Sequence, residues 1–383
     1  MCLFVAIFLN GPNRHHRRRH WWLDCGTRVA TTRFEPEVFE QAPALLDVGA
    51  AIAIWPNAMR VLDRLQLVDQ IIEKAGVMEE IRWLDQQGHL INRVRIAATA
   101  ETSKYPAVAL HRADLQGTLL HALPDDSIHL DSALMKCSER SDKIIATFAN
   151  GHSIEADFLI GADGIHSDVR CQLLNDGDPI ARGYTVWRGI SPNIPSAIPF
   201  ATAVELHGRG KRFGIGPVGL GRVGWWATAN HANTTDLPGL FEGWFPPVVE
   251  LIESTPASSI LKTASLDRFP TRNWGRGRMT MLGDAIHPTT PNLGQGGCLA
   301  MEDAMVLARC FEKYGVTEDA FRNYERVRYA RTATLSRYSR YYGAIGQWEN
   351  IWARGLRKTA LALAPEALLQ RLMRIVFNYD ATV

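Results

Sequence analysis

The pattern of hydrophobic and polar positions divides the chain into an early part where strand and helix signals alternate, a sheet-rich middle and a helical end. Residues 41–56 are predicted to form a loop that carries the short apolar run 48–52. A helix is predicted from about Asn57, because Met59 and Leu62 recur at helical spacing and Pro56 suits a first helical turn.

Period-two alternation over residues 81–96, interrupted at Gln87-Gly88, predicts two strands joined by a turn. Residues 110–123 favour a helix. Two further strands are expected at 144–148 and 158–160, and Asn150-Gly151, a frequent hairpin turn, is expected to join them.

Residues 184–230 carry short runs rich in glycine, tryptophan and β-branched residues between turns, which is typical of an antiparallel sheet. From Leu299 the signal is helical almost to the end. The sequence therefore predicts an α/β fold, in which a Rossmann-like nucleotide domain is interrupted by an antiparallel-sheet domain and followed by C-terminal helices.

Composition narrows the class of protein. Of 383 residues, 46% are hydrophobic and 21% charged, which suits two or three domains and excludes disordered chains and small disulfide scaffolds. The six cysteines lack CxxC or metal-ligand spacing, so a reducing, cytoplasmic setting without a metal site is expected. The apolar run 3–9 is too short for a membrane span, and basic residues follow it, the reverse of a signal peptide.

Two glycine-rich strand ends carry the candidate chemistry. One strand at 158–160 runs into Gly161-Ala162-Asp163-Gly164, where glycine lets backbone approach a ligand and the carboxylate accepts hydroxyl hydrogen bonds. About 120 residues later, a strand at 279–282 runs into Gly283-Asp284, then Pro291-Asn292-Leu293-Gly294-Gln295-Gly296-Gly297 and a long helix. Free N–H groups at a helix start suit an anionic or electron-rich ligand, although each motif alone also fits an ordinary turn.

Together the two motifs resemble the paired fingerprints of single-component FAD-dependent aromatic hydroxylases, the monooxygenases of the p-hydroxybenzoate hydroxylase fold. The resemblance extends to Glu40, to residues 48–57 and to Arg112 in 110–115. It covers the chain from about residue 34 onward. The residues around Trp55 and in 291–297 are most similar to the urate hydroxylases and the zeaxanthin epoxidase group.

The resemblance implies an FAD site. Glu40 would bind the adenosine ribose, Arg112 would contact the FAD chain, and Leu134 would reach the adenine side by its backbone. Asp284 would hold the ribityl hydroxyls. The complete expected set for FAD is Glu40, Ala53, Arg112, Leu134, Asp163, Asp284, Leu293, Gly294, Gln295, Gly296 and Gly297.

The resemblance also implies that NADH or NADPH reduces FAD, that O2 adds to the flavin as a C4a-hydroperoxide, and that its distal oxygen hydroxylates or epoxidises an electron-rich substrate. The substrate-side candidates are Arg212, His287 and Asn292. Arg212 either holds an anionic substrate group or is a solvated strand arginine. His287 either assists proton transfer or supports neighbouring groups. Only one of Trp225 and Trp226 is expected to face the pocket, because adjacent strand residues point to opposite faces.

Two positions depart from the urate hydroxylases. Asn292 stands where they place an acidic residue, and Gly224 stands where they place a pocket tyrosine. A base for urate is therefore lacking. The aliphatic and tryptophan-rich surroundings favour an apolar aromatic, polyketide-like or terpenoid substrate.

The expected G-x-G-x-x-G loop is missing about 20 residues before Glu40, where residues 15–23 read His-His-Arg-Arg-Arg-His-Trp-Trp-Leu. Reading the implied codons one nucleotide later permits Ala-Ile-Ile-Gly-Ala-Gly-Ile-Gly-Gly-Leu from position 14. We therefore hypothesise that residues 13–33 are translated out of frame, with a first strand still available from residues 3–9. Without the six arginines and one aspartate of that segment, the formal charge changes from +2 to −3.

If residues 13–33 are genuine, the alternatives are a flavin-free remnant without catalysis or a basic arm for nucleic acid. The leading prediction has a small-molecule substrate and O2 as partners, no nucleic acid, and a monomer or homodimer. The expected organisation is an FAD-binding domain at 1–75, 101–175 and 273–310, a substrate domain at 76–100 and 176–272, and C-terminal helices at 311–383.

Overall fold

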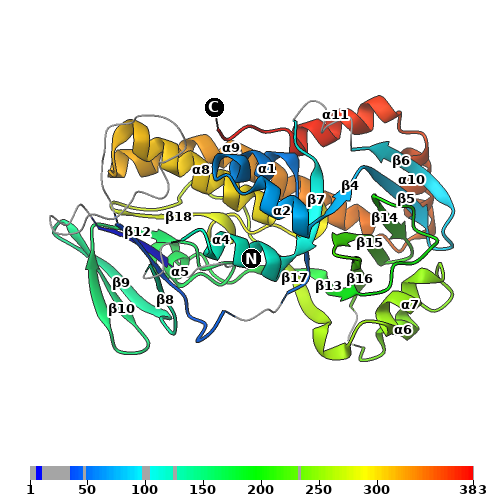
Figure 1. Cartoon of the computed structure of the whole chain (residues 1–383), viewed down its shortest axis with the longest axis horizontal. Helices are drawn as coiled ribbons and strands as arrows, with labels where there is room; N and C mark the ends of the chain where they lie inside the picture. The colour runs from blue at the N-terminus through cyan, green and yellow to red at the C-terminus, as the bar shows by residue number, and fades with distance from the viewer. Residues whose placement is uncertain are drawn as a thin grey trace.

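Long helices lie along a set of β-sheets in an elongated molecule (Figure 1). The computed structural model describes residues 6–10, 35–45, 49–96, 104–123, 127–231 and 234–382. The segment 13–33, and with it the out-of-frame hypothesis, lies outside the described residues.

The first sheet has the order β18-β12-β1-β2-β8 and is formed by β1 (Ala6–Asn10), β2 (Glu35–Phe39), β8 (Ile128–His129), β12 (Phe158–Gly161) and β18 (Met279–Met281). β12 runs parallel to β18, and β2 runs parallel to β8. β1 runs antiparallel to both of its neighbours, with Ala6 opposite Phe39 and Asn10 opposite Glu35. A first strand therefore forms where one was expected, but its direction is not that of a βαβ unit, whose strands are parallel.

The largest sheet has seven strands in the order β17-β13-β16-β15-β14-β5-β6. These strands are β5 (Glu80–Asp85), β6 (Leu90–Arg95), β13 (Ile180–Ser191), β14 (Thr202–His207), β15 (Lys211–Gly219), β16 (Arg222–Asn230) and β17 (Leu261–Asp267). The predicted antiparallel sheet and the predicted strand pair over 81–96 are confirmed. One junction, β14 with β5, is parallel.

Two small sheets complete the strands. One consists of β3 (Ala51–Ile54), β7 (Ala107–His111) and β4 (Gly76–Met78), and the other of β11 (Ser153–Ala156), β10 (Lys143–Phe148) and β9 (Leu134–Arg140). The prediction that residues 41–56 form a loop was wrong for β3, because its backbone pairs with β7. The prediction that Asn150-Gly151 joins strands 144–148 and 158–160 was also wrong, since that turn leads to β11.

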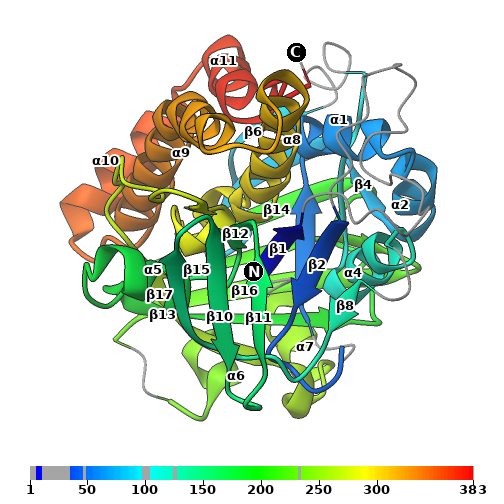
Figure 2. The ribbon, with the colours of Figure 1, turned by 90° about the vertical axis from the view of Figure 1, so that its left-hand side faces the viewer.

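Helices cover the sheets from several sides (Figure 2). They are α1 (Pro56–Arg64), α2 (Val68–Lys74), α4 (Arg112–Leu120), α5 (Asp168–Leu174), α6 (Leu237–Leu240), α7 (Pro247–Glu253), α8 (Gly296–Tyr314), α9 (Glu318–Gly346), α10 (Ile351–Ala362) and α11 (Glu366–Phe377), with short 3-10 turns η1 (Ala257–Ser259), η2 (Gly283–Ala285) and η3 (Pro291–Leu293). The predicted helix at Asn57 is confirmed as α1. The helix expected over 110–123 begins only at Arg112, because Leu110 belongs to β7.

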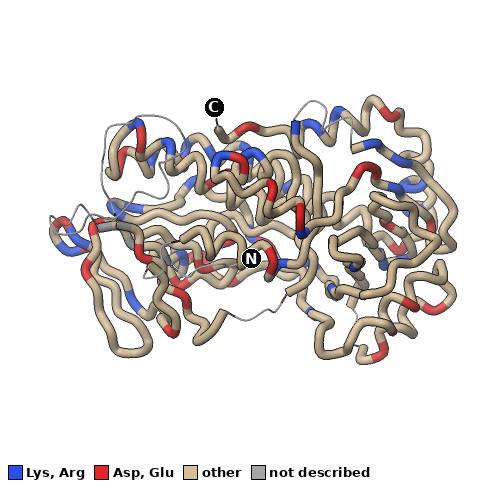
Figure 3. The backbone as a smooth tube through the Cα atoms, viewed as in Figure 1, with Lys and Arg blue, Asp and Glu red and all other residues tan. Residues whose placement is uncertain are grey.

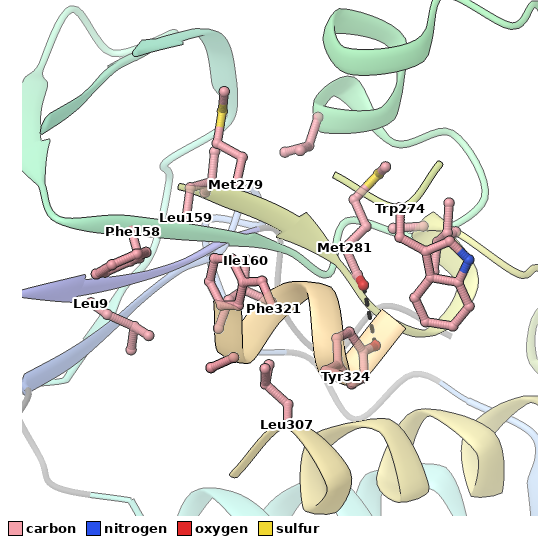
Figure 4. Close-up of a cluster of buried hydrophobic side chains, with 14 of the residues drawn as sticks. Leu9, Phe158, Leu159, Ile160, Trp274, Met279, Met281, Leu307, Phe321 and Tyr324 are labelled. Atoms are coloured by element: carbon pink, nitrogen blue, oxygen red, sulfur yellow. Dashed lines mark hydrogen bonds between the residues drawn. The ribbon is translucent and has the colours of Figure 1, made fainter. Parts of the chain in front are cut away.

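The main core lies between the first sheet and helices α8 and α9. Phe158, Leu159 and Ile160 of β12 are buried beside Leu307 and Phe321 of the helices (Figure 4). The hydroxyl of Tyr324 donates a hydrogen bond of 3.2 Å to the carbonyl oxygen of Met281. This packing fixes the ends of β12 and β18 relative to α8.

Candidate functional site

The two glycine-rich strand ends lie side by side. Gly161 of β12 is paired with Met281 of β18, and the amide of Leu282 donates to the carbonyl of Gly161 at 3.0 Å. Asp163 and Asp284 therefore follow neighbouring parallel strands at the same edge of the sheet. The carboxyl edge of parallel strands is where α/β folds commonly bind ligands.

Asp163 is held in place while part of its carboxylate stays available. Its Oδ2 accepts a 3.0 Å hydrogen bond from the amide of Val169, in the first turn of α5. Its Oδ1 is buried and has no hydrogen-bond partner among the described residues. Burial raises the pKa of Asp163, although hydrogen bonds from Ser167 and Val169 oppose that effect.

The glycine-rich loop, residues 291–297, leads into the first turn of α8. Gly294 has a φ of 61°, in the left-handed region that favours glycine. A Cβ at Gly294 would lie 3.1 Å from Nε1 of Trp55 and 3.7 Å from Cβ of Ala53. A Cβ at Gly296 would lie 3.6 Å from Oδ1 of Asp284. The loop therefore packs against β3 on one side and beside Asp284 on the other.

Two buried donors at this loop lack acceptors within the described part of the chain. They are Nε1 of Trp55 and Nε2 of Gln295. The orientation of Gln295 is fixed by its neighbours: Nδ2 of Asn57 donates to Oε1 of Glu302 at 2.6 Å and to Oε1 of Gln295 at 3.0 Å. The Gln295 amide nitrogen is then the side-chain atom left without a partner among the described residues.

A buried ionic network connects residues 283–287, which precede the loop, to α8 and α9. Nε2 of His287 and the amide of Gly283 both contact Oδ2 of Asp303, which lies on α8. Arg328 of α9 reaches Asp303 and Glu302, each at 2.7 Å. Burial would raise the pKa of Asp303, but the charges of His287 and Arg328 hold it below its usual value. In this arrangement His287 is 5% exposed and contacts a buried carboxylate.

Arg212 and Asn292 are brought together. Nη2 of Arg212 donates to Oδ1 of Asn292, and Nη1 donates to Oε1 of Glu205 at 3.0 Å. Arg212 is fully buried, and its Nε also donates to Oε1 of Gln347 at 3.3 Å. Arg212 is therefore no solvated strand arginine, and its charge is met by acceptors of the chain itself.

Asn292 is also fully engaged. Its Nδ2 lies 2.8 Å from Oγ1 of Thr290, 2.9 Å from the carbonyl oxygen of Ser339 and 3.0 Å from the hydroxyl of Tyr184. The Arg212–Asn292 contact thus joins the seven-stranded sheet to the glycine-rich loop and to α9.

Trp225 and Trp226 point to opposite faces, as expected for neighbours on a strand. Trp225 is buried, and its Nε1 donates to Oγ1 of Thr255 at 2.8 Å. Trp226 is partly exposed and lies against Gly214, with the Arg212 guanidinium 5.2 Å from its ring centre. Trp226 is therefore the one next to Arg212.

The residues expected at the adenosine end and along the FAD chain lie elsewhere, on the first sheet and on neighbouring elements. Glu40 follows β2, is buried, and accepts a 2.9 Å hydrogen bond from the amide of Ala42. Arg112 opens α4 and packs against Gly49, where a Cβ would lie 2.9 Å from Cβ of Arg112. Leu134 opens β9 with its side chain buried in the main core.

Sequence reasoning missed several residues that shape this site. Glu205, Gln347 and the Glu302–Arg328 pair were not singled out. A signal existed for the last pair: two adjacent carboxylates on an otherwise apolar helix face require basic partners when buried. Within the described residues, no cluster of His, Cys, Asp and Glu could hold a metal ion, and no helix is long and apolar enough to cross a membrane.

Comparisons with known proteins agree with this geometry. A family model described as an FAD binding domain matches residues 250–334, which include β18, the glycine-rich loop and α8. The aurachin C monooxygenase/isomerase of Stigmatella aurantiaca is 38% identical, with 85% of this chain and 87% of the relative covered. An FAD-dependent urate hydroxylase of Klebsiella pneumoniae is 31% identical, with 82% and 84% covered.

Solved structures give the same result. Klebsiella pneumoniae HpxO, solved in complex with FAD and uric acid, aligns with a TM-score of 0.82 at 28% identity, over 89% of this chain and 90% of HpxO. A salicylate hydroxylase substrate complex shares the fold with a TM-score of 0.71 at 21% identity, over 87% and 89% of the two chains. The chain belongs to the FAD-dependent monooxygenases.

Proposed function

We propose that this chain uses FAD, NADH or NADPH, and O2 to transfer one oxygen atom to an electron-rich aromatic or other apolar small molecule. The reaction balances as substrate, O2, NAD(P)H and a proton giving oxygenated substrate, NAD(P)+ and water. The observation that carries the proposal is that Asp163 and Asp284 follow neighbouring parallel strands at one sheet edge, with Asp284 beside the glycine-rich loop.

The described residues fit the isoalloxazine and ribityl half of FAD. Asp163 offers an unpaired carboxylate oxygen, and Trp55 and Gln295 offer buried N–H groups that lack acceptors within the described residues. Hydroxyl groups of a ribityl chain suit the carboxylates, and an electron-rich pyrimidine ring suits the N–H donors and the start of α8. FAD, when bound, supplies the two-electron chemistry with NAD(P)H and the activation of O2.

The chain's own residues would orient FAD and the substrate and shield them from water. We assign Asp163 and Asp284 to the ribityl hydroxyls, and the loop Leu293–Gly297 with Ala53 to the ring. The Arg212–Asn292 pair, closed by Glu205 and Gln347, would keep the substrate side of the loop rigid. His287, held by Asp303, supports Gly283 and hence Asp284. Glu40 and Leu134 keep their proposed places at the adenosine end, and Arg112 keeps its proposed contact with the FAD chain.

The sheet connectivity supports the proposed division into domains. β5 and β6, from 76–100, join the seven-stranded sheet together with β13 to β17, from 176–272. The first sheet draws on the remaining segments through β8, β12 and β18. The exception is β4, at the start of 76–100, which pairs with β7 of the expected FAD-binding segment 101–175.

A screen that follows both NAD(P)H oxidation and product formation tests the substrate class. We expect apolar phenols and fused aromatics to give coupled turnover, and urate to give none, because Asn292 is no base. Coupled turnover with urate and none with apolar phenols would overturn this choice.

One observation favours the second candidate, a flavin-free remnant. β1 runs antiparallel to β2, so its last residue, Asn10, lies beside Glu35 at the amino edge of β2 and away from Asp163 and Asp284. In a dinucleotide-binding βαβ unit the first strand ends at the ligand edge. Purified protein with a flavin absorption band that persists through gel filtration supports the monooxygenase, and colourless protein that gains no band on adding FAD supports the remnant.

A further inference from the structure

The helix α10 exposes apolar side chains to solvent. Trp352, Leu356 and Leu363 recur on one face and are 82%, 65% and 76% exposed. None of the residues of this fully described helix is buried. A surface helix ordinarily turns its apolar stripe toward the core.

The side of α10 that faces the protein carries Leu361, which packs against the small cluster of Trp83, Val94 and Leu369, and the guanidinium of Arg357. Nη1 of Arg357 donates to the carbonyl oxygens of Ile345 and Gly346 at 3.0 and 2.6 Å, and its Nη2 donates to that of Gly208 at 3.1 Å. Nζ of Lys358 lies 3.0 Å from Oδ2 of Asp85. These contacts fix the helix so that its apolar stripe points outward.

The next helix also exposes apolar side chains. α11 follows α10 after three residues and also packs on β6, and it exposes Leu368, Leu372 and Ile375 at helical spacing. Figures 1 and 2 show both helices on the outside of the molecule. We call the six residues Trp352, Leu356, Leu363, Leu368, Leu372 and Ile375 the outer stripe.

The charges of helices α10 and α11 have one dominant sign. Over residues 351–377 the sequence has a single acidic residue, Glu366, and five basic residues, Arg354, Arg357, Lys358, Arg371 and Arg374. Arg371 and Arg374 are exposed beside the apolar residues of α11, where Figure 3 shows basic positions. A second copy of the chain would bring like charges together around the stripe, which is unfavourable.

We propose that helices α10 and α11 dock on an anionic lipid surface, with the outer stripe inserted at the interface and the exposed Arg371 and Arg374 against the lipid headgroups. A tryptophan-bearing apolar face flanked by Lys and Arg is the pattern of helices that lie in the membrane interface. Each basic residue near an anionic surface adds attraction that salt weakens.

Sedimentation of the full chain with vesicles tests the proposal. We expect binding to phosphatidylcholine vesicles that contain phosphatidylserine, weaker binding at high salt, and a blue shift of tryptophan fluorescence. The variant W352S/L356S/L363S should lose at least about tenfold in partitioning, because three exposed apolar side chains no longer insert.

The matched control is F200S/L220S, which removes two exposed apolar side chains, 97% and 65% exposed, outside these two helices. It should bind vesicles as the parent does. Unchanged thermal unfolding of both variants checks that they fold. The salt dependence of vesicle binding by the parent protein tests the proposal without any variant. Absent vesicle binding, equal binding to phosphatidylcholine alone, or a dimer that the triple variant splits into monomers would each overturn the proposal.

Discussion

Two glycines on one face of α9 make room for the side chains that join the glycine-rich loop to the seven-stranded sheet. A Cβ at Gly343 would lie 2.4 Å from Nδ2 of Asn292, and one at Gly346 would lie 2.6 Å from Nε of Arg212. Glycine inside a helix costs about 0.5–1 kcal/mol relative to alanine, so these positions trade helix stability for close approach.

Gly343→Ala should therefore destabilise the fold by about 1–3 kcal/mol, because the methyl group displaces an amide already held by four groups. Gly117→Ala in α4 is the control. A Cβ there meets no described atom within 4 Å, so we expect a gain of about 0.5–1 kcal/mol. Urea unfolding measures both, and a stabilised Gly343→Ala variant would contradict the packing described for Asn292.

His207 gives a pH signature at the same end of the molecule. Burial lowers the pKa of His207 to about 4, with Arg212 and Arg357 adding to that effect and Glu205, 3.4 Å away, opposing it. An unfolded histidine titrates near 6.5, so the unfolded chain binds more protons between these values. Stability should therefore fall by about 2–3 kcal/mol from pH 6.5 to pH 4 through this residue.

Urea unfolding at several pH values checks this expectation with two variants. His207→Asn should flatten the decline over that interval, whereas His152→Asn, at an exposed histidine, should leave the slope unchanged. Equal slopes in the parent and the His207→Asn variant would show that His207 is not the group responsible.

At the scale of elements, α8 and α9 are joined by ion pairs that lie almost entirely in the interior of the protein. Arg328 is fully buried between Glu302 and Asp303, and Arg331 adds a second contact to Glu302 at 2.8 Å. Removing one member of a buried ionic group leaves the others uncompensated, which costs more than the pair contributes.

Arg328→Leu should destabilise the fold by about 3–5 kcal/mol and release His287 and Gly283 through Asp303. Arg326→Leu, at an exposed position on the same helix, should change stability by no more than about 0.5 kcal/mol. Thermal unfolding compares the two, and similar midpoints would argue against a supporting role for the network.

Elements with a clear period were predictable, and those defined by partners were not. The start of α1 and the strands over 81–96 followed from local pattern. β3 was missed because four residues carry no period, and its strand character comes from pairing with β7. The prediction that β12 forms a hairpin with the strand at 144–148 was wrong, because β12 pairs with β1 and β18. All four residues of β12 are buried, which is typical of a central strand and not of a hairpin with one exposed face.

The candidate site was predictable from its motifs only in part. The resemblance pointed to Asp163, Asp284 and the glycine-rich loop, which the structure brings together. The engagement of Arg212 by Glu205 and Gln347 depends on contacts between residues 7 and 135 positions apart, and no local pattern encodes them.

At the scale of the whole molecule, β1 runs antiparallel to β2 and ends at the sheet edge opposite to Asp163 and Asp284, whereas the first strand of a dinucleotide-binding unit ends at the ligand edge. Replacing the segment that starts at position 14 with Ala-Ile-Ile-Gly-Ala-Gly-Ile-Gly-Gly-Leu should lower the Kd for FAD at least about 100-fold, because a glycine turn at a helix start receives the pyrophosphate. Fluorescence titration with FAD compares the two chains. Equal affinities would show that FAD binding by this chain does not depend on such a loop.

The most direct test of the proposed function follows the oxygen atom. Protein saturated with FAD is supplied with NAD(P)H, 18O2 and an apolar phenol, and the product is analysed by mass spectrometry. We predict one 18O atom in each product molecule, formed in step with NAD(P)H oxidation. If NAD(P)H is oxidised but no substrate tried gives a product that contains 18O, the result would contradict an oxygen-transferring enzyme.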